Sequence, residues 1–155
     1  MQGSRALAKE RRQRESPEER HRVVLLPADL LHFIELTGFS DDWQHLGLDD
    51  DDLSKLQFAL MEGAKNSPVI PGTGGLRKMR FAPTGWRAGK RGAIRVCFCW
   101  WEEFEIVLLI TAYAKNEQSN LSPKARQMFR KLIKVTEQEL EARRRKDFHR
   151  GARVL

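Results

Sequence analysis

Two neighbouring apolar segments, residues 93–101 and 104–112, constrain the fold of this chain most strongly. One face of the first segment would carry Ile94, Val96, Phe98 and Trp100. The opposite face would carry Arg95, Cys97, Cys99 and Trp101. This alternation is typical of a β-strand whose two faces meet different surroundings. Because only the tight turn Glu102-Glu103 separates the segments, they are predicted to pair as an antiparallel hairpin.

Further strands are expected on either side of this hairpin. Residues 76–81 predict a strand with Lys78 and Arg80 on one face and Met79 and Phe81 on the other. The glycine-rich turn before it, 72–75, lets the chain turn into that strand. A short first strand is predicted at 22–27, before a helix at 28–37 that Gly38 ends.

Two more helices are predicted from their start signals and apolar stripes. The aspartates 49–52 suit the start of a helix, which favours negative charge; the alternative, a metal site, is the less simple interpretation. The stripe of that helix is Leu53, Leu56, Leu60 and Met61. Ser122 is a good N-cap and Pro123 a good first residue for a C-terminal helix. Its stripe is Ala125, Met128, Phe129, Leu132 and Ile133, which we expect to pack on the sheet.

The predicted fold class is therefore α+β, a small antiparallel sheet with N-terminal helices and a C-terminal helix packed on it. We expect one folded domain at 22–140, between a basic, disordered arm at 1–21 and a basic tail at 141–155. The arm is either a nucleic-acid-binding segment or a solvated tail.

The charge distribution indicates an anionic partner. The net charge is +7, and residues 63–101 contain no Asp or Glu. The cations in this stretch are Lys65, Arg77, Lys78, Arg80, Arg87, Lys90, Arg91 and Arg95. Ordinary protein surface mixes both signs, so an acid-free basic stretch favours RNA or DNA binding over a merely solvated face.

The remaining composition indicates a cytoplasmic protein without metal or cofactor. Cys97 and Cys99, at i and i+2, are poorly placed for a disulfide and too few for a zinc site. Such cysteine usage is typical of a reducing compartment. The apolar run 106–112 is too short to span a bilayer, so no membrane partner is expected.

If the strands pair as neighbours, Lys78, Arg80 and Arg95 line one face of the sheet, and Lys90 and Arg91 lie in the loop at its rim. Such a cluster can bind successive phosphates and stabilise charge that develops on one of them.

Three motifs then resemble a known family. Gly74-Gly-Leu-Arg-Lys-Met-Arg80 is similar to the GGLRKxR segment of RelE/HigB-type toxins, and Gly89-Lys-Arg-Gly-Ala-Ile-Arg-Val96 to their GKRGGxRV segment. Tyr113-Ala-Lys-Asn-Glu117 with Asn120-Leu-Ser122 resembles their YxKNExxDLS segment. The motifs occur in the family's order across about residues 22–135, and the HigB-like branch is the most similar.

The resemblance implies a toxin of a type II toxin–antitoxin pair, a metal-independent endoribonuclease that cleaves mRNA on the ribosome. It implies catalytic roles for Lys78, Arg80 and Arg95. The implied RNA-binding residues are Lys90, Arg91, Arg77, Lys115 and Asn116. Lys115 and Asn116 either bind RNA or order the strand-to-helix corner, and Tyr113 belongs either to the site or to the core. The implied partners are the ribosome, mRNA and an antitoxin, typically a helix-turn-helix protein encoded next to the toxin.

Two other functions remain open at this point. A related ParE-like toxin would inhibit gyrase, although ParE-like proteins typically lack the sheet-face cations. A non-catalytic RNA- or ribosome-binding protein is the other, because Cys97 stands where the family often has a tyrosine. The histidines His21, His32, His45 and His149 fall outside the motifs, so histidine-based catalysis is not predicted.

Overall fold

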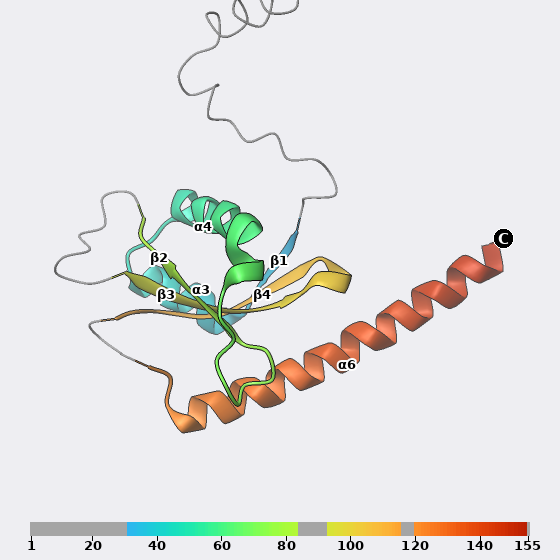
Figure 1. Cartoon of the computed structure of the whole chain (residues 1–155). Helices are drawn as coiled ribbons and strands as arrows, with labels where there is room; N and C mark the ends of the chain where they lie inside the picture. Colours follow the sequence, from blue (N-terminus) through green and yellow to red (C-terminus); the bar gives the residue numbers. More distant parts are fainter. Residues whose placement is uncertain (1–30, 84–92, 116–119, 155) are drawn as a thin grey trace, which may run out of the picture. The chain divides into compact units, whose positions relative to one another are not determined.

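A four-stranded sheet with helices on both faces forms the folded part of the chain. The computed structural model describes residues 31–83, 93–115 and 120–154. The strands are β1 (His32–Glu35), β2 (Arg77–Phe81), β3 (Ile94–Trp101) and β4 (Ile106–Ala114), in the order β1-β4-β3-β2. The helices are α3 (Thr37–His45), α4 (Asp50–Gly63) and α6 (Pro123–Val154), with short 3-10 turns η2 (Ala64–Asn66) and η3 (Glu102–Phe104) (Figure 1). The α+β class and the C-terminal helix on the sheet are confirmed.

The central hairpin is confirmed. β3 and β4 pair antiparallel, with Val96 opposite Ala112 and Trp101 opposite Ile106. The connection is η3, after which Glu105 adopts a left-handed conformation with φ of 54°. β4 begins and ends two residues later than predicted, because η3 and Glu105 take up the residues just after the turn.

The helix predicted at 28–37 was wrong over its described residues. Residues 32–35 form a strand, β1, instead of part of a helix, and β1 runs parallel to β4, so the sheet is mixed and not antiparallel throughout. The backbone N–H of His32 donates to the carbonyl oxygen of Glu105 at 2.8 Å, and that of Leu36 to Leu109 at 3.0 Å. The short apolar run fits a helix or a strand equally, and its hydrogen bonds to the distant β4 make it a strand. The strand predicted at 22–27 lies outside the described residues.

Helix α3 was not predicted, and Gly38 lies inside its first turn instead of ending a helix. Its inner face carries Phe39 and Trp43. Its Asp42 carboxylate accepts hydrogen bonds from the Thr111 hydroxyl at 2.8 Å and the Ala112 amide at 3.2 Å, which ties the helix to β4.

The predicted start of α4 is confirmed, and it explains the aspartate run. The Asp49 carboxylate accepts from the Asp52 amide at 2.9 Å, and the Asp52 carboxylate accepts from the Asp49 amide at 3.1 Å. This is a capping box, which satisfies backbone N–H groups that a helix start leaves unpaired. These hydrogen bonds lower the pKa of Asp49.

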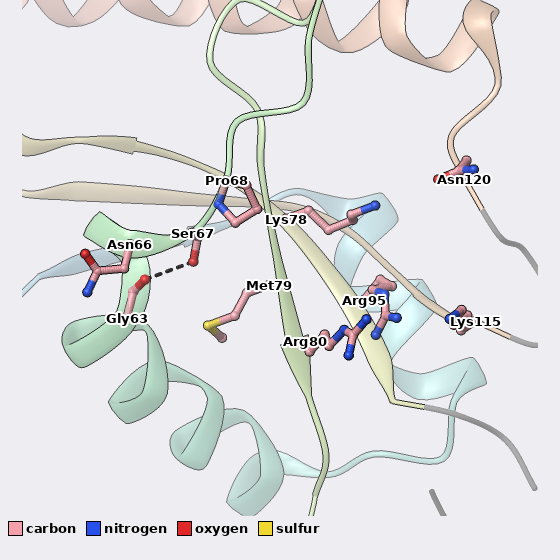
Figure 2. Close-up of a pocket in the computed structure, with 10 residues that line it drawn as sticks. All are labelled: Gly63, Asn66, Ser67, Pro68, Lys78, Met79, Arg80, Arg95, Lys115 and Asn120. Atoms are coloured by element: carbon pink, nitrogen blue, oxygen red, sulfur yellow. Dashed lines mark hydrogen bonds between the residues drawn. The ribbon is translucent and has the colours of Figure 1, made fainter. Parts of the chain in front are cut away.

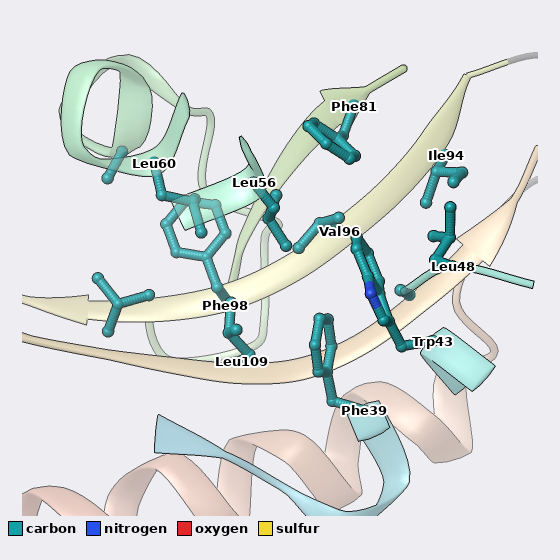
Figure 3. Packing of buried hydrophobic residues seen from close by; sticks show 13 residues of the cluster. Phe39, Trp43, Leu48, Leu56, Leu60, Phe81, Ile94, Val96, Phe98 and Leu109 are labelled. Atoms are coloured by element: carbon teal, nitrogen blue, oxygen red, sulfur yellow. The ribbon is translucent and has the colours of Figure 1, made fainter. Parts of the chain in front are cut away.

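The sheet separates two apolar cores. Toward α3 and α4 lie Phe81, Ile94, Val96, Phe98, Val107 and Leu109, which pack on Phe39, Trp43, Leu56 and Leu60 (Figure 3). Toward α6 lie Leu76, Cys97, Cys99, Trp101, Leu108, Ile110 and Tyr113, which pack with Ile133, Phe129 and Ala125. The predicted division of β3 into two faces is confirmed.

Helix α6 begins as predicted and extends further. The Ser122 hydroxyl accepts from the Ala125 amide at 3.1 Å, and Pro123 is the first helical residue. The helix continues to Val154, through the segment predicted to be a tail. It is held beyond its first turns by the Trp101 indole, which donates to the Glu137 carboxylate at 3.0 Å.

Candidate nucleic-acid interface

A row of polar side chains crosses three strands near the start of α6. The register places Arg80 on β2 directly opposite Arg95 on β3, and Arg95 directly opposite Tyr113 on β4. Lys78 pairs with Cys97, whose side chain lies in the core that faces α6. Directly opposite residues project to the same face, so Lys78, Arg80, Arg95 and Tyr113 share the α6 side of the sheet. The prediction that the first three share one face is confirmed.

The two arginines differ in how they meet solvent. Arg80 is exposed, because β2 is an edge strand, whereas only 6% of Arg95 is exposed. Lys78 is half-buried.

An open pocket of about 740 Å³ lies along this row. Its cations are Lys78, Arg80, Arg95 and Lys115, and its other polar side chains belong to Asn66, Ser67 and Asn120. Figure 2 shows the guanidinium groups of Arg80 and Arg95 close together, with Lys115 and Asn120 on the far side of Arg95. None of the described residues that line the pocket is Asp, Glu or His.

None of these cations forms an ion pair with another described residue. Among the described residues, the ion pairs are Arg143–Glu139 at 3.5 Å, both on α6, and Arg144–Glu103 at 3.1 Å, which joins α6 to η3, and all four side chains are exposed. Like charges directly opposite each other on neighbouring strands destabilise a sheet. The Arg80–Arg95 pair therefore favours an anion between or above the two guanidinium groups.

Arg77, which we predicted to bind RNA, is placed on the opposite face. Its Nη1 atom donates to the carbonyl oxygen of Ser67 at 2.7 Å, and its guanidinium lies 5.6 Å from the centre of the Trp100 ring. These contacts join β2 to the segment after α4. The structure thus brings Lys115 to the pocket but not Arg77, and Lys90, Arg91 and Asn116 lie outside the described residues.

Sequence reasoning missed Arg126, on the first turn of α6. Its Nε atom is buried and has no hydrogen-bond partner in the described chain, and the same holds for Arg95 Nη1 and the Tyr113 hydroxyl. Burial raises the pKa of Tyr113, and the neighbouring Cys97 adds to this, while Arg95 and Arg126 oppose it. The sequence motif covers Tyr113, but no local signal marks Arg126, because it reaches this cluster only through packing of α6.

The two cysteines on this face are not suited to nucleophilic chemistry. Burial raises the pKa of the Cys97 thiol to about 12, and burial together with the nearby Glu137 raises that of Cys99 to about 12. A thiol is nucleophilic only as the thiolate, so neither cysteine is reactive at neutral pH. They act as small apolar residues under α6.

Neither a metal site nor a membrane-spanning helix is found among the described residues. In these parts of the chain no three His, Cys, Asp or Glu side chains are grouped closely enough to hold a metal ion. No helix in them has the length and apolar character that a membrane span needs.

Comparison with known proteins adds one structural likeness. No family model matches the sequence. Over 57% of its length, the chain is similar to a solved structure described as a metal-bound toxin from Helicobacter pylori, of which 99% is covered. The identity is 17% and the TM-score is 0.31, values too low to say what this chain does.

Proposed function

We propose that the chain is the toxin of a toxin–antitoxin pair and cleaves mRNA bound to the ribosome. The single observation that carries this proposal is the row Lys78, Arg80 and Arg95 at one pocket, without a carboxylate among the described lining residues. Two of the three motifs that resemble RelE/HigB-type toxins supply this row: segment 74–80 contains Lys78 and Arg80, and segment 89–96 contains Arg95.

The chemistry that fits these groups is an internal displacement at phosphorus. The ribose 2′-oxygen loses its proton to solvent water and attacks the adjacent phosphorus, and the bond from phosphorus to the 5′-oxygen breaks. The products are a 2′,3′-cyclic phosphate and a 5′-hydroxyl. Arg80 and Arg95 stabilise the extra negative charge on the phosphorane, and Lys78 donates a proton to the departing 5′-oxygen.

Part of the substrate's geometry must come from the ribosome in this proposal. Among the described residues that line the pocket, no carboxylate or imidazole is present to act as a general base for the 2′-hydroxyl. An mRNA held in a bent conformation already places the 2′-oxygen near the phosphorus, which supplies much of the rate without a strong base.

The proposed protein partner is an antitoxin with an acidic segment that covers the basic row. Four cations at one pocket, with no ion-pair partner among the described residues, favour a complementary surface. Exposed Arg80 and Lys115 lie at the edge of such a contact, so the complex should weaken as the ionic strength rises.

A cell-free translation reaction tests the proposed activity. We expect added protein to cut a reporter mRNA only when that mRNA carries translating ribosomes, leaving 5′-hydroxyl ends. Intact mRNA together with loss of gyrase supercoiling activity would instead indicate a ParE-like toxin. Binding to pelleted ribosomes without any cleavage would indicate a non-catalytic ribosome-binding protein.

A further inference from the structure

Three of the four buried polar atoms without a partner in the described chain belong to Arg95, Tyr113 and Arg126. The fourth, Trp100 Nε1, belongs to a residue that packs against the α3 and α4 core on the other face of the sheet. More than nine in ten buried polar groups in folded proteins have a partner, so several orphaned groups at one place need an explanation.

The three side chains come together through the sheet and α6. Arg95 and Tyr113 are direct neighbours across β3 and β4, and each is only 6% exposed. Ala125 and Phe129, which flank Arg126 on α6, pack in the same core cluster as Tyr113. The charge of Arg126 is also close enough to lower the pKa of the Tyr113 phenol.

An anion is the ligand that this arrangement favours. Two positive guanidinium groups lie here, one buried on Arg95 and one half-buried on Arg126, and a buried charge without a counter-charge is strongly unfavourable. A phenol O–H and guanidinium N–H groups all donate, so the group that satisfies them must accept several hydrogen bonds. Phosphate oxygens do this, and arginine binds them in a planar, two-pronged geometry.

We infer that Arg95, Tyr113 and Arg126 form a phosphate-binding subsite between β3, β4 and the first turn of α6, beside the Lys78–Arg80 pocket. Arg95 belongs to both, since it also lines that pocket. The subsite takes a phosphate of the RNA backbone next to the one that is cleaved, an assignment that rests on the proposed function. The phosphate-binding property itself does not require cleavage.

Tyr113 is the only tyrosine in the chain, which gives a direct probe. Full-length protein with ¹³C at the tyrosine ζ-carbon has one such resonance, and it is followed at neutral pH during additions of inorganic phosphate. A second titration uses a short single-stranded RNA, and sodium chloride at equal ionic strength is the blank. We expect saturable shifts with phosphate and with RNA, and none with sodium chloride.

Arg126→Ala and Arg130→Ala form a matched pair of variants. Both remove one arginine from α6, one turn apart, but Arg130 is exposed and lies beside Gly74. Loss of one charge-assisted contact should weaken phosphate binding about tenfold in Arg126→Ala. Arg130→Ala should stay within about twofold of the parent, the effect of net charge alone. Tyr113→Phe, which keeps the ring, should weaken phosphate binding several-fold without changing the melting temperature.

Three results would overturn the inference. A Tyr113 resonance that does not move at saturating phosphate would make the cluster a purely structural feature. Equal weakening in Arg126→Ala and Arg130→Ala would show that only net charge matters. Binding of inorganic phosphate but not of RNA would refute the RNA backbone as the ligand. None of these measurements involves ribosomes or cleavage, so a failure here is distinct from a failure of the proposed activity.

Discussion

The two faces of the sheet differ in the kind of side chain that they bury. On the α3 and α4 face the core is apolar and aromatic: Phe39 stacks on Trp43 at 5.4 Å, and Trp43 on Phe81 at 6.0 Å. Its polar groups are largely satisfied, since the Trp43 indole donates to the Asp49 carbonyl oxygen at 3.0 Å and the Asp42 carboxylate accepts two hydrogen bonds from β4. On the α6 face an apolar core gives way, near the start of the helix, to buried and half-buried cations.

This difference separates stability from function within one small domain. On the α3 and α4 face, burial of aromatic surface stabilises the fold, and few polar groups remain available to bind a ligand. The α6 face contains an unfavourable arrangement: two arginines lie directly opposite each other, and the buried Arg95 guanidinium has no counter-charge among the described residues. Such local cost is typical of a binding or catalytic site, where the ligand supplies the missing interactions.

The largest expected effect is on the aromatic core. Phe39 is fully buried, so Phe39→Ala should lower the free energy of unfolding by about 3–5 kcal/mol through lost burial and a residual cavity. Phe58→Ala is the control, since Phe58 is 48% exposed on α4 and should cost far less. Urea unfolding measures both. Equal losses in the two variants would contradict the assignment of the main core to this face.

Substitution of Arg95 should not lower the free energy of unfolding, in contrast to Phe39→Ala. Arg95→Met replaces a buried guanidinium, which has no ion pair among the described residues, by an apolar side chain of similar length and so removes its desolvation cost. We expect the free energy of unfolding to stay level or to rise by about 1–2 kcal/mol, while mRNA cleavage is lost. Thermal and urea unfolding decide this. A variant that unfolds much more easily than the parent would show that Arg95 holds the fold together.

A smaller effect is expected on the pH dependence of the free energy of unfolding, through the buried Cys97 thiol under α6. The folded chain keeps the Cys97 proton up to a pKa of about 12, whereas the unfolded thiol loses it above about 9.0. Between these values the unfolded state binds fewer protons, so the free energy of unfolding falls as the pH rises. At about pH 10 the loss from this thiol is about 1 kcal/mol.

Urea unfolding of the parent and of Cys97→Ala at about pH 8 and about pH 10 measures this term as the difference between their pH dependences. The parent should lose more stability over that interval than Cys97→Ala. If the two chains lose the same amount, the Cys97 thiol is not shielded from water by α6.

Features that depend on neighbouring residues, such as strand alternation and helix caps, could be predicted from the sequence. Alternation places Arg95 and Cys97 on the face away from Val96, and the capping residues fix the starts of α4 and α6 within the chain. β1 could not be predicted, because residues 32–35 are a strand only through hydrogen bonds to β4, about seventy positions away. Arg126 was missed for the same reason: its place in the cluster is set by how α6 packs.

The most direct test of this account compares mRNA cleavage and folding in Arg80→Ala. Arg80 is exposed, and loss of one contact to the phosphorane should cost about 3 kcal/mol, or about a hundredfold in cleavage rate on ribosomes. The melting temperature should be unchanged, and ribosome pelleting should fall far less than cleavage, because other cations still hold phosphates. Arg145→Ala, at an exposed arginine far along α6, should cleave like the parent. If Arg80→Ala also cleaves like the parent, the basic row on the α6 face is not the active site.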